Sequence, residues 1–154
     1  MTLSRRAALR LVVGGSACLS IAPARAAIAE AGFVRIGGIE QWIAIRGSDP
    51  GNPVIVFLHG GPGEATSPFL DEFGPWQDHF TVVAWDQRGA GRTFGRNGAA
   101  TPDMTLARLV DDAVEVTGYA KSRFPGRKIL LVGQSWGAML GTCLLTSPST
   151  RPDR

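Results

Sequence analysis

Cysteine is scarce in this chain, and its scarcity excludes a fold held together by disulfides. The 154 residues include only two cysteines, Cys18 and Cys143. We expect Cys18 to be removed with an amino-terminal leader, so Cys143 would have no partner for an internal disulfide. Its leucine neighbours instead favour a buried, apolar role for the remaining thiol.

Acidic residues are absent from the first 26 residues, and this absence accounts for the net charge of +3. Four of the 16 basic residues lie there, so the rest of the chain carries 12 basic and 13 acidic residues. This balance predicts no nucleic-acid partner, and no stable membrane association once the leader has been removed.

The leader itself has the layout of a signal peptide. Its apolar stretch, Leu11–Ala22, is too short to span a bilayer. It follows the basic pair Arg5-Arg6 and precedes Ala24-Arg25-Ala26, a small-x-small cleavage site. These features predict an export signal over residues 1–26 and a mature domain over residues 27–154.

Two kinds of signal fit the route of export. Ser4-Arg5-Arg6 resembles the start of a bacterial twin-arginine signal, and an ordinary export signal with two chance arginines is the alternative. A lipoprotein anchor at Cys18 is disfavoured, because Gly15 stands where a large aliphatic residue is expected. Each route places the mature chain in the bacterial periplasm or the extracellular space.

Hydrophobic periodicity predicts an α/β domain. Two alternating segments around Gly37-Gly38 predict an antiparallel hairpin, and continuous apolar runs predict buried strands. The predicted strands are residues 33–36, 41–45, 54–58, 81–85 and 129–132. The predicted helical segments are residues 69–76, 105–124 (with Thr105 as N-cap) and 136–145, and residues 87–103 are expected to form a long loop. This alternation favours a mainly parallel sheet with flanking helices.

The most informative motif is Gly133-Gln134-Ser135-Trp136-Gly137, which joins the last predicted strand to a helix. A tight strand–turn–helix elbow brings backbone against backbone, so Gly133 and Gly137 are expected where any Cβ would collide. The turn would hold the Ser135 hydroxyl out at the carboxyl edge of the sheet, where open α/β folds carry out their chemistry.

A glycine-rich loop, His59-Gly60-Gly61-Pro62-Gly63, follows an earlier strand. Such a loop can turn its backbone N–H groups toward a common point, as an oxyanion hole requires. A plain tight turn is the alternative, and the serine elbow downstream argues against it.

Together with a third segment, Asp86-Gln87-Arg88-Gly89-Ala90-Gly91-Arg92-Thr93, these motifs resemble the α/β-hydrolase superfamily. They are most similar to the prolyl iminopeptidase branch of serine peptidases, over roughly residues 32–145. The resemblance implies an α/β-hydrolase fold with a leading antiparallel hairpin followed by parallel strands. It further implies that carboxy-terminal strands and a helical cap are missing, so the fold would be incomplete.

The resemblance also assigns roles to residues. It makes Ser135 the nucleophile and the backbone N–H groups of Gly61 and Trp136 the oxyanion hole. The residue after the serine opens a helix, so its N–H is free at the positive end of the helix dipole. No metal or organic cofactor is implied, and the substrate would be a peptide or a small amide or ester.

Four further residues are expected to support the loops of the site. His59 and Gly60 would shape the oxyanion loop. Asp86 and Arg88 resemble family positions that brace the loops beside the site, and structural ion pairing is our interpretation of both. Gly133 and Gly137 remain the glycines of the elbow itself.

Histidine is also scarce, with two residues in the chain, and this bears directly on mechanism. A serine nucleophile needs a histidine base that is oriented by a carboxylate, and in this superfamily both follow the serine. None of the 19 residues after Ser135 is histidine, and Asp153 is the only carboxylate among them. His79 precedes a strand, so it is expected to be a solvated loop residue at the amino edge of the sheet, opposite the edge that carries Ser135. His59 is expected to orient its loop.

These observations predict an amino-terminal part of a hydrolase, truncated and inactive alone, with an apolar sheet edge open to aggregation. The complete enzyme would release N-terminal residues, proline by preference, through an acyl-enzyme on Ser135. An esterase or lipase-like hydrolase of the same fold is the first alternative. A non-catalytic remnant that binds small apolar ligands or a partner chain is the second.

Overall fold

The computed structural model describes residues 26–147. All but the last residue of the predicted signal peptide therefore lies outside the described residues, as does the chain from residue 148. Five strands form one sheet: β1 (Ile28–Ile36), β2 (Ile39–Gly47), β3 (Val54–Leu58), β4 (Thr81–Asp86) and β5 (Ile129–Gly133). The helices are η1 (Ser67–Phe73, a 3-10 helix), α1 (Gly74–Gln77), α2 (Gly91–Asn97), α3 (Leu106–Arg123) and α4 (Trp136–Thr146).

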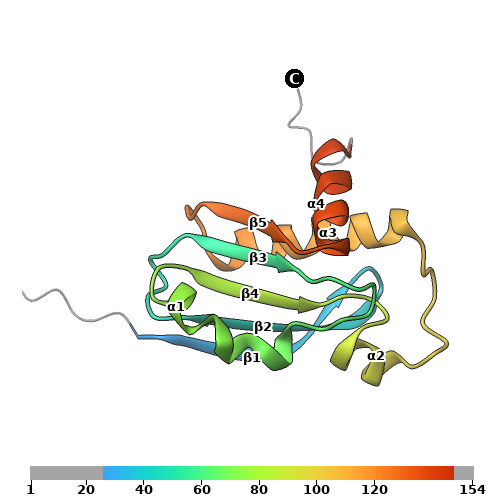
Figure 1. The fold of residues 1–154 in the computed structure, drawn as a ribbon, viewed down its shortest axis with the longest axis horizontal. Helices are drawn as coiled ribbons and strands as arrows, with labels where there is room; N and C mark the ends of the chain where they lie inside the picture. Colours follow the sequence, from blue (N-terminus) through green and yellow to red (C-terminus); the bar gives the residue numbers. More distant parts are fainter. Residues whose placement is uncertain (1–25, 148–154) are drawn as a thin grey trace, which may run out of the picture.

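The strand order is β1-β2-β4-β3-β5, as Figure 1 shows from the lower to the upper edge of the sheet. The hairpin of β1 and β2 is antiparallel, and β2 also pairs antiparallel with β4. Only the pairings of β3 with β4 and with β5 are parallel. The prediction of a mainly parallel sheet is therefore wrong. The hairpin lies directly beside β4, so antiparallel pairings are as frequent as parallel ones in the described sheet. The predicted hairpin followed by parallel strands is confirmed.

The three parallel strands end at the same edge of the sheet, where α2 and α4 begin (Figure 1, right). Helices α3 and α4 pack on one face through a core that includes Val56, Val83 and Val116. Residues Leu70 and Phe73 of η1 cover the other face. Successive residues of a strand point to opposite faces, so apolar residues at every position of β3 and β4 supply both layers.

Strand β5 departs from the prediction of a buried strand. Its residues are only partly buried, and Leu130 is 40% exposed, whereas every residue of β3 and β4 is buried. Within residues 26–147, β5 pairs with β3 alone, so its outer edge faces no other strand. An apolar run thus predicted the strand correctly but not its burial.

The long loop predicted over residues 87–103 is also wrong, since α2 occupies its centre. Its glycines argued against a helix, but a tertiary contact supplies what the local sequence lacks. The Asp86 carboxylate accepts a hydrogen bond from the Arg92 N–H (2.9 Å), one of the donors that a helix start leaves unsatisfied. By contrast, the predicted N-cap of α3 is confirmed, because the Thr105 hydroxyl accepts from the Arg108 N–H.

Candidate active site

Ser135 lies at the apex of the turn between β5 and α4, and its side chain is exposed. Its backbone has φ +51° and ψ −115°. A positive φ is uncommon for any residue with a Cβ, and such strain persists only where the surrounding structure enforces it. The elbow therefore presents the hydroxyl to solvent at the carboxyl edge of the sheet, as predicted.

The two glycines of the elbow are required by close backbone approach. A Cβ on Gly133 would lie 2.6 Å from the Ala138 nitrogen and also against the Gly137 carbonyl. A Cβ on Gly137 would collide with the carbonyl of Leu58 and lie 2.8 Å from the His59 oxygen. Both contacts are shorter than real Cβ atoms allow, so the sequence interpretation of these glycines is supported by the geometry.

The oxyanion loop lies directly beside the elbow. Strand β3 pairs with β5 up to Leu58 and Gly133, and the Gln134 N–H then donates to the Leu58 carbonyl (3.1 Å). A Cβ on Gly60 would lie 3.4 Å from the Gln134 oxygen, so the two turns are in contact. Gly61 has φ +109°, and a Cβ there would lie 2.6 Å from the Gly63 nitrogen. Only glycine fits this loop at position 61.

The two amides assigned to an oxyanion hole are free of intramolecular acceptors. Within residues 26–147, neither the Gly61 N–H nor the Trp136 N–H donates a hydrogen bond to the protein. Trp136 is the first residue of α4, so its N–H belongs to the unsatisfied, positive end of the helix. Two free donors on adjacent turns can stabilise a negative charge that develops between them.

His59 is buried and cannot act as a base for Ser135. Its Nδ1–H donates to the Gly60 carbonyl (2.8 Å), and its Nε2 accepts from the Gln87 N–H (3.0 Å). Both ring nitrogens are thus engaged within the loop. Burial lowers the pKa of His59 below its ordinary 6.5, although the bond to Gly60 and the charge of Asp86 partly oppose this. This pair of bonds requires the neutral ring and holds it within the loop.

His79 lies at the other end of the sheet. It is exposed and precedes β4, which begins at Thr81, so it is placed at the amino edge of the parallel strands. The sequence contains no third histidine. Neither histidine is therefore placed to take the proton of Ser135.

Sequence reasoning missed Gln87, which connects the parts of the site. Its side-chain Nε2 donates to the His59 carbonyl (3.1 Å), and its Oε1 accepts from the Trp136 indole N–H (3.1 Å). The sequence feature that could have identified Gln87 is its position directly after β4. Because β4 is the neighbour of β3, the residue that follows it lies next to the residue that follows β3.

Asp86 braces the loops beside the site, but not through an ion pair. Its carboxylate accepts from the Ser67 hydroxyl (2.9 Å) and from the Arg92 N–H (2.9 Å). Its backbone oxygen accepts from the Thr93 hydroxyl (2.6 Å). Among the ion pairs of the described residues, none includes Asp86. The expectation of ion pairing was wrong here, because the Ser67 hydroxyl and the Arg92 N–H satisfy the carboxylate instead.

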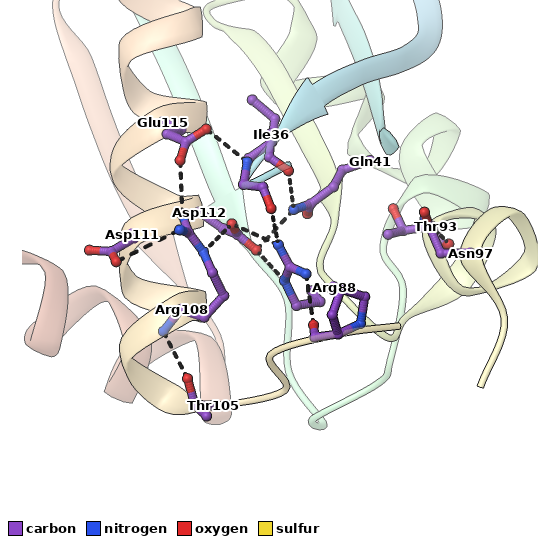
Figure 2. A network of polar contacts seen from close by, with 12 residues as sticks. Ile36, Gln41, Arg88, Thr93, Asn97, Thr105, Arg108, Asp111, Asp112 and Glu115 are labelled. Carbon is purple, nitrogen blue, oxygen red and sulfur yellow. Dashed lines mark hydrogen bonds and ion pairs between the residues drawn. The ribbon is translucent and has the colours of Figure 1, made fainter. Parts of the chain in front are cut away.

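Arg88 does form the expected ion pair, as Figure 2 shows. Its Nε lies 2.8 Å from Asp112 of α3, and both side chains are completely buried. Its remaining donors bind the carbonyls of Gly37 and Pro102. Arg88 thus ties the strand exit to the hairpin turn and to α3, and its role is structural.

Two of the hollows formed by the described residues are not lined by Ser135. One, of about 360 Å³, is an apolar groove beside β5 lined by Val114, Ile129, Leu131 and Leu144 among others. In the described part of the chain, no group of three or more His, Cys, Asp or Glu side chains could hold a metal ion. Among residues 26–147, no helix is both long and apolar enough to cross a bilayer. Cys143 is half-buried against the core.

Comparison with known proteins identifies similar chains. The family model described as "alpha/beta hydrolase fold" matches residues 53–154. The chain is 34% identical over 132 residues to the probable aminopeptidase YbaC of Bacillus subtilis, which corresponds to 85% of this chain and 40% of that protein. It is 35% identical over 124 residues to a proline iminopeptidase of Neisseria meningitidis, or 80% of this chain and 36% of that one.

A solved structure is similar to this chain in fold. The crystal structure of a proline iminopeptidase-related protein from Thermus thermophilus superposes with a TM-score of 0.62 and 25% sequence identity, over 79% of this chain and 41% of that one. The chain spans about two fifths of the length of the relatives that it matches.

Proposed function

Because the chain belongs to the α/β-hydrolase fold family, we propose that its Ser135 is the nucleophile of an acyl-transfer site. The observation that carries this proposal is the pair of free amides, Gly61 N–H and Trp136 N–H, beside an exposed and strained serine. A site with these parts is suited to attack on a carbonyl carbon.

The proposed reaction forms a bond between the Ser135 Oγ and the substrate carbonyl carbon. The serine proton passes to a base, and the carbonyl oxygen becomes an oxyanion that accepts from the two free amides. Collapse of this intermediate expels the amine or alcohol, which takes up a proton, and water then hydrolyses the acyl-enzyme. Loss of one such donor typically costs about 3 kcal/mol of transition-state stabilisation.

The base is the part that the chain does not supply. His59 uses both ring nitrogens within its loop, and His79 lies at the opposite edge of the sheet. We therefore propose that the 154-residue chain alone is close to silent, and that an external base would restore reactivity of Ser135.

Release of N-terminal residues from peptides is the favoured activity of the whole enzyme. Its support is the names of the similar proteins, an aminopeptidase and a proline iminopeptidase. An esterase or lipase-like activity of the same site is the alternative, since fold does not decide the substrate. Export to the periplasm or beyond is proposed on the leader sequence.

A fluorophosphonate probe tests the proposal on the full chain, since it phosphonylates activated serines. In buffer alone we expect slow labelling. Added imidazole should accelerate labelling of Ser135 at least about tenfold by acting as the base. Ser135→Ala should abolish the adduct, and Ser122→Ala, at an exposed serine of α3, should not. Labelling that is unaffected by imidazole, or that persists in Ser135→Ala, would contradict the proposal.

A second candidate function is that of a non-catalytic chain that binds an apolar ligand or partner. The groove beside β5 favours it, because Leu145 and Leu130 close by are exposed. The same experiment separates the two: a binding protein would show no imidazole-dependent adduct at Ser135.

A further inference from the structure

We infer that Gln87 is a positioning residue that sets the spacing and direction of the two oxyanion donors. The inference rests on the proposed function, because those donors matter only if Ser135 performs acyl transfer. Gln87 acts through His59 on one side and through Trp136 on the other. It is 2% exposed, and both ends of its side-chain amide are bonded.

One chain of hydrogen bonds leads from residue 87 through His59 to the Gly61 donor. The Gln87 N–H donates to His59 Nε2, so the ring proton must reside on Nδ1. That Nδ1–H donates to the carbonyl of Gly60. The Gly60 carbonyl and the Gly61 N–H belong to one planar peptide unit, so fixing the direction of the oxygen fixes the direction of the N–H. The backbone N–H of residue 87 thus sets the tautomer of His59, and the Gln87 side chain adds a second hold on the same residue through its bond to the His59 carbonyl.

A second hydrogen bond links the Gln87 side chain to Trp136, which carries the other donor. The Gln87 Oε1 accepts from the Trp136 indole, and the backbone N–H of the same residue is the donor at the start of α4. The Gln87 Nε2 is meanwhile held by the His59 carbonyl. One side chain thus links the two turns that carry the donors, across the exit of β3.

A second buried glutamine provides a matched control. Gln41 accepts from the Trp85 indole N–H (2.8 Å) and donates to Asp112 (2.9 Å), and the bond to Asp112 belongs to the network of Figure 2. Replacing either glutamine by methionine removes a buried glutamine–indole hydrogen bond at nearly constant volume. Only replacement of Gln87 should disturb the oxyanion donors.

The test compares Gln87→Met, Gln87→Glu and Gln41→Met in the full chain. The first measurement is the rate of imidazole-assisted fluorophosphonate labelling at Ser135. We expect Gln87→Met to lower it by about tenfold to a hundredfold, as small misplacements of catalytic groups do. Gln87→Glu keeps the acceptor for the indole but replaces the donor to the His59 carbonyl by a second acceptor, so it isolates the bond to Trp136. Gln41→Met should stay within about twofold of the wild type, corrected for the folded fraction.

The second measurement needs no reaction at Ser135. In ¹H–¹⁵N spectra, Gln87→Met should shift the backbone amide signal of Trp136 most, because its indole loses the Oε1 acceptor. The Gly61 signal should shift less, because the backbone N–H of residue 87 still binds His59, and Gln41→Met should leave both signals in place. Unchanged amide signals in Gln87→Met, or equal slowing of labelling by Gln41→Met, would overturn the inference. If wild-type Ser135 shows no assisted labelling, the proposed function fails, while the amide signals still decide the role of Gln87.

Discussion

Two buried glutamines each accept a hydrogen bond from a tryptophan indole, and their surroundings differ. Gln41 bonds to Asp112, a carboxylate that also binds the guanidinium groups of Arg88 and Arg108. Gln87 has only neutral partners, two of them on His59. The first region is a compensated network of charges, and the second is a set of single hydrogen bonds around free amides.

The comparison shows that the contacts that hold the fold together and the groups of the candidate active site lie in different regions of the chain. In the Asp112 network every charged group within the core has a partner, so the region holds the hairpin, the β4 exit and α3 together (Figure 2). At the carboxyl edge, two donors have no acceptor among residues 26–147, and Ser135 keeps a positive φ. Strain and unsatisfied donors are tolerated there because the rigid strands over-determine the turn.

The largest effect should follow from breaking the charged network. Asp112→Ala leaves the buried guanidinium of Arg88 without its carboxylate, and loss of one partner of a buried pair costs about 3–5 kcal/mol. Urea denaturation followed by circular dichroism measures the free energy of unfolding. Asp111→Ala is the control, because its carboxylate is 56% exposed and its pair with Arg108 is long. Equal losses in the two variants would remove the distinction between the regions.

The next effect should come from the elbow. Gly137→Ala places a Cβ against the Leu58 carbonyl, so we expect a loss of about 1–3 kcal/mol, as for overpacking. Gly141→Ala lies in the same helix, where its Cβ would make an ordinary contact at 3.4 Å with Leu58. That control should gain stability from the higher helix propensity of alanine. A neutral Gly137→Ala would show that the elbow is less tightly packed than described.

The third effect is confined to acid pH. The pKa of His59 is lowered in the folded state, so the unfolded chain binds the proton more tightly. The folded state should therefore lose stability as the pH falls below about 6.5 toward the folded pKa. His59→Gln should flatten this part of the stability–pH curve. A steep acid loss that persists in His59→Gln would assign it to other groups.

The smallest effect has the opposite sign. Ser135→Gly relieves the positive φ, so we expect a gain of about 1 kcal/mol in the free energy of unfolding, together with loss of labelling. Ser122→Gly, in the last turn of α3 and with no positive φ to relieve, should gain no stability. Destabilisation by Ser135→Gly would mean that the serine side chain contributes packing that outweighs the strain.

Much of this arrangement could be predicted from local sequence. Apolar runs predicted β3 and β4, glycine spacing predicted the elbow, and Thr105 predicted the start of α3. These features depend on neighbouring residues, so a single chain segment contains the information. The expected orienting role of His59 followed from its place within the glycine-rich loop.

The features that escaped prediction depend on residues distant in sequence. Helix α2 forms against the Asp86 carboxylate, and the exposure of β5 follows from which strand lies beside it. The role of Gln87 depends on Trp136, 49 positions away. None of these contacts has a periodicity or a spacing that a single sequence reveals.

The central claim is that Ser135 faces two amides ready to receive an oxyanion. A crystal structure of the full chain phosphonylated at Ser135 in the presence of imidazole tests it most directly. We predict the phosphonyl oxygen within about 3 Å of both the Gly61 and the Trp136 nitrogens. An oxygen directed to solvent, with both amides bonded elsewhere, would contradict the account.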